Sequence, residues 1–157
     1  MNEYMMAAID LAEKNLETND GGPFGAVIIK DGVIVGRGRN TVLRDNDPTS
    51  HAEVSAIRDA CKNLNTYSLE GCTLYTTCYP CPMCLGAIIW SNISKVYYGN
   101  TKEDADMIGF RDDDIYDFIK GNNKMIDLEQ LDREETIKTF NKFINKETLH
   151  FFKRGEC

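Results

Sequence analysis

The first 100 residues alternate between helical and strand patterns, and this order is the strongest constraint on the fold. Apolar residues that recur every three or four positions predict helices, and short runs rich in β-branched residues predict strands. In chain order these segments are a helix at 5–16, strands at 24–29 and 33–39, a helix at 54–64, a strand at 73–77, a helix at 83–90 and a strand at 95–98. A chain with this order is expected to form a mixed sheet covered by helices, an α/β sandwich.

Three of these segments carry more specific expectations. The Lys30-Asp31-Gly32 sequence predicts a tight turn, so the first two strands pair as an antiparallel hairpin. The first helix has an apolar stripe that ends at Leu16, and this stripe is expected to face the core. Pro80 opens a helix, 83–90, that is apolar on almost every face, so we expect this helix to be buried.

The composition changes after Gly99. Residues 103–117 include seven acidic residues and one basic residue, which places this segment at the surface. Residues 134–146 carry apolar side chains on one face, which predicts an amphipathic helix that either caps the core or packs on a neighbouring subunit. Because no repeat or linker divides the chain, we expect a single domain over 1–157.

Composition also argues against several classes of protein. The chain has 25 acidic and 18 basic residues, a net charge of -7, which opposes binding to nucleic acid or to anionic membranes. No apolar run approaches the roughly 18 to 20 residues that span a bilayer, and residues 1–16 lack the apolar core of a signal peptide. We therefore expect a cytoplasmic location. The six cysteines are then interpreted as thiols or metal ligands rather than disulfides.

Two cysteines and a histidine form a candidate metal site. Cys81 and Cys84 lie three residues apart at the start of a predicted helix, so they share a face, and the amide groups of the first turn favour their thiolates. His51 starts another predicted helix and points inward. Three such ligands leave the fourth position of a tetrahedral zinc for water, whose pKa then falls towards about 7.

Glu53 follows His51 by two residues and is the candidate proton carrier. A carboxylate beside activated water can take a proton from it and deliver that proton to a leaving group. The combined pattern His-x-Glu with Pro-Cys-x-x-Cys is a signature of zinc deaminases. It indicates a hydrolase that acts on a polarised C=N carbon.

Plainer interpretations stand beside this one. Ser50 and Glu53 fit a capping box, in which the Glu53 carboxylate binds a backbone amide and has no part in catalysis. His51 and the two cysteines can also be ordinary core residues. If Cys78 joined the three ligands, the site would be a closed structural zinc centre in a non-catalytic binding module. The complete motif favours the catalytic interpretation, with Cys78 as a packing residue.

The sequence resembles the cytidine and deoxycytidylate deaminase superfamily and, within it, the small bacterial guanine deaminases. The segments that carry the resemblance are 21–28 (Gly-Gly-Pro-Phe-Gly-Ala-Val-Ile), 46–49, 51–54, 81–88 and 109–110. The resemblance implies a three-layer α/β/α sandwich around a five-stranded mixed sheet, with one zinc ion per subunit. It also implies hydrolysis of an exocyclic amino group to a carbonyl with release of ammonia, as in the conversion of guanine to xanthine in purine salvage or catabolism.

The resemblance assigns roles by position. His51, Cys81 and Cys84 match the zinc ligands, and Glu53 matches the catalytic proton shuttle. Tyr79 is a departure, because Glu often precedes the Pro-Cys of the motif.

Three further residues match positions that bind the substrate. Phe24 corresponds to the aromatic residue that packs on the purine, and Asn40 to the amide that bonds the polar edge of the base. Asp112 corresponds to the carboxylate that accepts from the ring N–H groups, with Asp113 and Asp114 as the neighbouring alternatives.

The resemblance further implies a homodimer. In the bacterial guanine deaminases the C-terminal segment, here 131–157, crosses to the partner subunit and helps to cover its active site. Phe151 and Phe152 are the candidates for closing that pocket.

Other members of the superfamily are the main rivals. Transfer-RNA adenosine deaminases share the Asp47-Pro48-Thr49 segment and the zinc motif, but the net charge of -7 disfavours them. The residues that could form a basic stripe for RNA are Lys30, Arg37, Arg39 and Arg44. Guanosine and cytosine are alternative substrates. The aromatic Phe24 favours a free purine base over a flipped nucleotide, so we expect guanine and water as substrates and no nucleic-acid partner.

Overall fold

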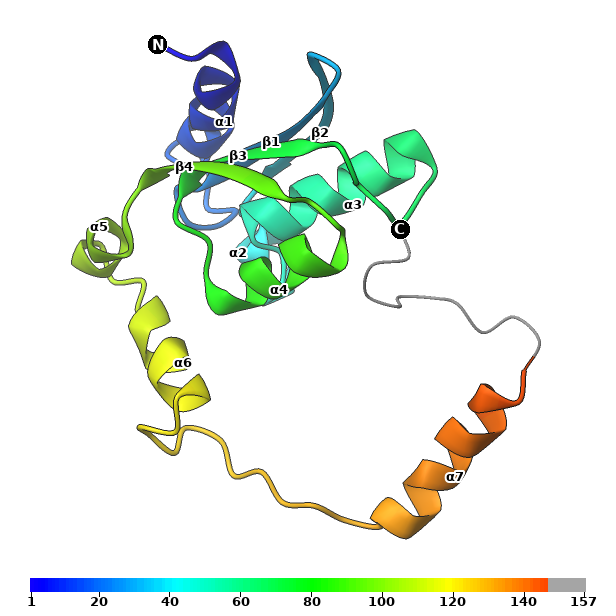
Figure 1. The fold of residues 1–157 in the computed structure, drawn as a ribbon. Helices are drawn as coiled ribbons and strands as arrows, with labels where there is room; N and C mark the ends of the chain where they lie inside the picture. The colour runs from blue at the N-terminus through cyan, green and yellow to red at the C-terminus, as the bar shows by residue number, and fades with distance from the viewer. Residues whose placement is uncertain (147–157) are drawn as a thin grey trace. The chain divides into compact units, whose positions relative to one another are not determined.

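The computed structural model describes residues 1–146, which form two compact units. The first unit is Met1–Tyr116, and the second begins at Asp117. Phe151 and Phe152 lie outside the described residues, as does the end of the 131–157 segment. The elements are α1 (Glu3–Lys14), β1 (Gly25–Lys30), β2 (Val33–Arg39), α2 (Val42–Asp45), α3 (Ala52–Leu64), β3 (Thr73–Cys78), α4 (Pro82–Trp90), β4 (Lys95–Asn100), α5 (Lys102–Met107), α6 (Asp112–Ile119) and α7 (Arg133–Ile144) (Figure 1).

The sheet is mixed and, over residues 1–146, has four strands in the order β2-β1-β3-β4. Strand β1 pairs antiparallel with both β2 and β3, and β3 pairs parallel with β4. The hairpin turn is confirmed: Asp31 and Gly32 have the positive φ angles, 50° and 77°, that a two-residue turn of this kind requires. The fifth strand that the resemblance implied is wrong for this part of the chain. After β4 the described chain forms only helices and irregular segments, and the acid-rich residues 103–117 lack a strand pattern.

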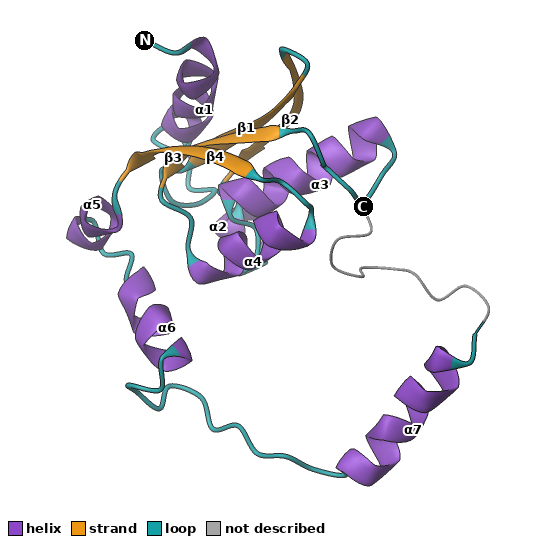
Figure 2. Cartoon of the chain, in the orientation of Figure 1, coloured by secondary structure: helices purple, strands orange, loops and turns teal. Residues whose placement is uncertain are grey.

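Strand β1 is buried on both faces and separates two apolar clusters. Its side chains alternate between the faces, as they must in an extended chain. Ala26 and Ile28 join the cluster beneath α3 and α4, whereas Val27 and Ile29 pack with Ala8 of α1. Helix α1 therefore covers one face of the sheet, and α3 and α4 cover the other (Figure 2). This is the three-layer arrangement expected from the sequence.

Helix α3 packs unusually close to strand β2. Gly36 and Gly38 face it, and a Cβ atom built on Gly38 would lie 2.3 Å from the Ala52 carbonyl oxygen. On the helix side, small residues meet the strand, since Ala52, Ala56 and Ala60 are all fully buried. The absence of side-chain bulk on both surfaces lets the helix backbone rest on the strand, which fixes where α3 begins.

One expectation about a helix is wrong, and another is wrong at one residue. Helix α4 is not buried all round, because Ile89 is 72% and Trp90 is 67% exposed. Only Cys84 and Ile88 are buried on this helix, so residues 1–146 leave part of its apolar surface uncovered. The apolar stripe of α1 does face the core at Ala12, which is buried, and at Met5, which packs on the cluster that contains Ala8. Leu16, in contrast, lies beyond the end of α1 and is exposed.

Helix α7 belongs to the second unit and is amphipathic as predicted. Phe140, Phe143 and Ile144 lie on its apolar side and are exposed. Among residues 1–146, no helix has the length and apolar character to cross a membrane.

Replacing Gly38 with alanine is expected to destabilise the fold by about 1–3 kcal/mol, because the added methyl group would overlap the α3 backbone. Urea unfolding followed by circular dichroism measures the change. Gly86→Ala is the matched control: this position lies within α4 with nothing within 4 Å of the new methyl group, so the same substitution should stabilise by about 0.5–1 kcal/mol. Equal effects at the two positions would contradict the close packing of α3 on β2.

Candidate active site

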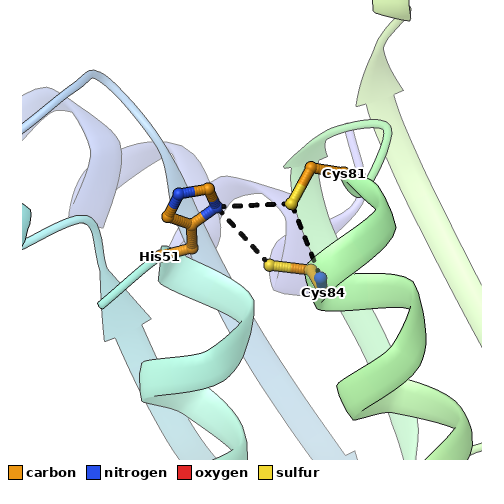
Figure 3. A group of neighbouring side chains, drawn as sticks. All are labelled: His51, Cys81 and Cys84. Atoms are coloured by element: carbon orange, nitrogen blue, oxygen red, sulfur yellow. Dashed lines mark hydrogen bonds between the residues drawn. The ribbon is translucent and has the colours of Figure 1, made fainter. Parts of the chain in front are cut away.

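The starts of helices α3 and α4 meet at three side chains. His51 occupies the N-cap position of α3, and Cys81 occupies the N-cap position of α4, with Cys84 one turn further along. The His51 Nδ1 atom lies 3.5 Å from the Cys81 sulfur and 3.6 Å from the Cys84 sulfur (Figure 3). These donor atoms all lie within 4.8 Å of one another. They come together from positions 30 and 33 residues apart in sequence.

This geometry fits tetrahedral zinc. Zn–S bonds of about 2.3 Å and Zn–N bonds of about 2.0–2.1 Å, at a tetrahedral angle, place sulfur and nitrogen ligands about 3.5–3.6 Å apart. Both observed sulfur–nitrogen distances match that spacing. Two thiolates and one imidazole are also a common donor set for zinc. The three side chains therefore suit this ion in distance and in chemistry.

The local structure prepares the cysteines for this role. Pro82 at the start of α4 has no N–H, and the Cys84 amide points back at the Cys81 sulfur at 3.5 Å. A hydrogen bond from the Cys84 thiol, helped by His51, lowers the pKa of Cys81 to about 4. The same bond and burial raise the pKa of Cys84, so the pair shares one proton. A divalent cation in contact with both sulfurs would replace that proton.

Glu53 is buried next to the three donor residues. It is only 6% exposed, and its Oε1 atom accepts a hydrogen bond of 2.9 Å from the Thr76 hydroxyl. Burial raises the pKa of Glu53, while hydrogen bonds from Cys84 and Thr76 oppose that rise. Its carboxyl group therefore holds a proton more readily than a free glutamate does, which suits a residue that accepts and releases a proton.

The capping-box interpretation of Glu53 is wrong. His51, not Ser50, is the N-cap residue of α3, and no side chain caps this helix end. The Ser50 hydroxyl instead donates to the Asp47 carboxylate at 3.2 Å. The Glu53 side chain is thus free of the helix end and faces strand β3.

Cys78 lies near the donor group but outside it. Its sulfur is 3.7 Å from the Thr101 carbonyl oxygen, and burial raises its pKa to about 11. It is therefore a neutral thiol at pH 7, with a backbone acceptor of its own. Within residues 1–146, the donor cluster consists of His51, Cys81 and Cys84. The closed four-ligand centre considered from the sequence finds no support in this arrangement.

A pocket in the first unit contains two of the donors and most of the other candidate residues. Its lining comes from the starts of α3, α4 and α6 and from the strand ends beside them. The residues are Phe24, Asn40, His51, Ala52, Glu53, Cys78, Tyr79, Cys81, Phe110 and Asp112. The proposed ligands His51 and Cys81, the shuttle Glu53 and the substrate contacts Phe24, Asn40 and Asp112 all line this pocket. Cys84 is fully buried and is not part of the lining.

An aromatic pair forms one wall of the pocket. The rings of Phe24 and Phe110 lie 4.8 Å apart and are perpendicular, an edge-to-face contact. The backbone at Gly22 packs closely against this pair, because a Cβ atom added at Gly22 would lie 2.7 Å from the Phe110 ring. The face of each ring is flat and apolar, so it can pack against a flat ligand.

Asn40 lines the same pocket and has a defined orientation. Its Oδ1 atom accepts a hydrogen bond of 3.1 Å from the Val42 amide. Because the oxygen has this partner, the NH₂ group is the end that remains to donate. Asn40 can therefore recognise an acceptor atom on a ligand.

Of the three consecutive acids Asp112, Asp113 and Asp114, only Asp112 lines the pocket. It is the first residue of α6, and burial raises its pKa. The helix is held by Tyr116, whose hydroxyl donates to the Pro80 carbonyl at 3.2 Å, directly before Cys81. The ring of Tyr116 also shares the Lys102 ammonium group with Tyr79, at 4.7 Å and 5.3 Å.

Three residues of the site were not assigned a role from the sequence. Thr76 holds Glu53, Phe110 completes the aromatic wall, and Tyr116 anchors α6. Thr76 sits on a buried strand, where a polar side chain needs a partner, and that was the available signal. Phe110 belongs to the 109–110 segment that carries the resemblance, but that segment gave it no role. Tyr116 lies in the acidic stretch, where nothing local marked it.

Comparison with known proteins gives consistent matches. The family described as cytidine and deoxycytidylate deaminase zinc-binding region matches residues 1–100. Guanine deaminase of Bacillus subtilis (strain 168) is 52% identical over 113 residues, which is 72% of each chain. The X-ray structure of guanine deaminase from Bacillus subtilis superposes with a TM-score of 0.91 at 43% identity, covering 98% of this chain and all of that one. The transfer-RNA-specific adenosine deaminase of Aquifex aeolicus is 43% identical over 95 residues, 60% of this chain and 62% of the relative.

Replacing Cys78 with serine is expected to leave the zinc content at one ion per subunit and the catalytic rate close to that of the wild type. Serine can still donate to the Thr101 carbonyl, so the cost should be limited to about 1 kcal/mol of stability. Zinc is measured by mass spectrometry of the purified protein. Cys84→Ser is the matched control and should lose the metal. Loss of zinc from the Cys78 variant as well would favour the closed structural centre.

Proposed function

The chain belongs to the family of the cytidine and deoxycytidylate deaminase zinc-binding region, and we propose that it hydrolyses free guanine to xanthine and ammonia. The observation that carries this proposal is the pocket at the starts of α3 and α4. It combines metal donors, a buried carboxyl group and an aromatic wall in one place. The likeness to guanine deaminases, at 52% identity in sequence and a TM-score of 0.91 in structure, supports guanine as the substrate.

His51, Cys81 and Cys84 would hold the zinc ion. When bound, zinc supplies the Lewis acidity that makes water a nucleophile near neutral pH. Glu53 takes the proton from the attacking water and later gives it to the departing nitrogen. A C–O bond forms at the ring carbon, the exocyclic C–N bond breaks, and ammonia leaves. The hydrogen bond from Thr76 keeps the Glu53 carboxyl group turned towards this reaction.

The purine is proposed to bind between groups of complementary chemistry. Phe24 provides the flat apolar contact, with Phe110 behind it. The NH₂ group of Asn40 donates to an acceptor on the polar edge of the base, since its oxygen is held by Val42. Asp112 accepts from the ring N–H groups.

The arginines of the surface give little support to a transfer-RNA substrate. Arg37, Arg39, Arg44 and Arg58 do line one hollow of about 380 Å³ beside β2. Three of them already have acidic partners, however: Arg39 with Asp20 at 2.7 Å, Arg44 with Asp45 at 2.9 Å and Arg58 with Asp47 at 3.6 Å. The local charge is largely compensated, and the chain as a whole carries -7. A small uncharged substrate suits this surface better than an RNA backbone.

We also propose that the protein works as a cytoplasmic homodimer in which the 131–157 segment of its single domain, 1–157, exchanges between subunits. The exposed apolar side of α7, with Phe140, Phe143 and Ile144, supports a packing partner for that helix.

The substrate is tested by measuring ammonia release from guanine, guanosine, cytosine, adenine and transfer RNA. Guanine is expected to have the highest kcat/KM, by at least about 100-fold over cytosine and adenine, because those bases would leave the polar groups of the pocket unpaired. Preference for guanosine would change the assigned substrate within the same reaction. Turnover of transfer RNA alone would contradict the proposal.

Replacing Glu53 with glutamine tests the proton shuttle. The amide has nearly the same shape but cannot accept the proton, so kcat should fall about 10²- to 10⁴-fold while zinc content and fold remain. Circular dichroism and metal analysis serve as controls for the variant. Full activity in Glu53→Gln would remove this residue from the mechanism.

A further inference from the structure

Asn15 is a buried amide outside the pocket whose hydrogen-bonding capacity is almost fully used. It follows the last residue of α1 and is only 6% exposed. Its NH₂ group donates to the Gly22 carbonyl at 2.6 Å and to the Asn40 carbonyl at 2.8 Å. Its oxygen accepts from the Arg39 guanidinium at 2.5 Å. Since two carbonyl groups accept from it, the orientation of this amide is unambiguous.

These bonds join the two stretches of chain that carry the proposed base contacts. Gly22 lies two residues before Phe24, and Asn40 itself follows the end of β2. The backbone N–H of Asn40 also donates to the Phe24 carbonyl at 3.1 Å. The Asn15 side chain thus links the same two stretches a second time, through the Gly22 and Asn40 carbonyls.

An ion pair extends this bridge towards the surface. The Arg39 guanidinium that binds Asn15 also contacts the Asp20 carboxylate at 2.7 Å. The backbone carbonyl of Asp20 accepts from the Leu43 and Arg44 amides, at 2.9 Å and 3.0 Å. The residue 20–22 loop is therefore tied to the chain that follows Asn40.

The fit between this loop and Asn40 leaves little freedom. A Cβ atom on Gly21 would lie 2.1 Å from the Oδ1 atom of Asn40. A displacement of the loop by a fraction of an ångström would therefore push directly on the amide proposed to read the base. Such close-packed contacts transmit small shifts rather than absorb them.

We propose that Asn15, supported by Arg39 and Asp20, is a positioning residue for base recognition. By holding the Gly22 and Asn40 carbonyls together, it keeps the Asn40 NH₂ group aimed at the purine. It also fixes the position of the loop before Phe24 relative to Asn40. This inference rests on the proposed function, since it assigns Asn15 an effect on the binding of guanine. Asn15 acts through Asn40 and takes no part in metal binding or proton transfer.

The test is the steady-state kinetics of Asn15→Leu on guanine. Leucine has a similar size but leaves both carbonyls without their donor, so KM should rise about 10-fold or more, with a smaller change in kcat and full zinc content. Asn63→Leu is the matched control. Asn63, in α3, likewise donates its side-chain amide to a backbone carbonyl, that of Val35 in β2 at 2.8 Å. It lies outside the pocket lining, so its loss should leave KM unchanged.

A double-mutant cycle separates positioning from general destabilisation. If Asn15 acts through Asn40, then adding Asn15→Leu to Asn40→Ala should change KM less than about 2-fold. If Asn15→Leu fails to fold, Asp20→Asn breaks only the outer ion pair and should still raise KM about 2- to 3-fold.

Three outcomes would overturn the inference, and they distinguish its failure from the failure of the proposed function. A wild-type KM in a folded Asn15→Leu variant, or full additivity with Asn40→Ala, would refute the positioning role while the proposed function stands. Absence of guanine turnover by the wild-type protein in the same assay would refute both.

Discussion

The close packing of α3 on strand β2 is the constraint on which the site depends. Gly36 and Gly38 bring the helix backbone onto the strand, so the first residue before α3, His51, has a fixed position relative to the sheet. Helix α4 covers the same face and begins at Cys81. Two helix starts thereby meet at one point, where their unpaired amide groups favour thiolates and the donors match the spacing of zinc ligands.

Strand topology brings the remaining side chains to the same edge. Because β1 runs antiparallel to β2 and β3, the start of β1 lies beside the ends of both. Phe24 precedes β1, Asn40 follows β2, and Thr76 lies near the end of β3. The pocket is therefore built at the carboxyl ends of β2 and β3, where loops and helix starts can offer polar groups without breaking the sheet. Asn15 reinforces this edge from the end of α1.

Local sequence patterns predicted the elements well and their environment less well. The four strands and the main helices follow from periodicity, whereas the fifth strand was inferred only from resemblance and is not found in residues 1–146. The burial of α4 failed because an apolar helix reveals that a partner surface is needed but not whether the same chain provides it. Glu53 fitted a capping box by spacing, yet it turns to Thr76, 23 residues away, a partner that spacing cannot reveal.

The sequence by itself determined the donor residues and the likeness to a zinc deaminase, because ligand type and helical spacing are local properties of the chain. Only the tertiary structure decided that His51 lies 3.5 Å and 3.6 Å from two sulfurs, that Phe110 faces Phe24, and that Asp112 rather than its neighbours reaches the pocket. These relations join segments tens of residues apart. They depend on how helices pack on the sheet, which is set by the sum of many contacts and not by any single motif.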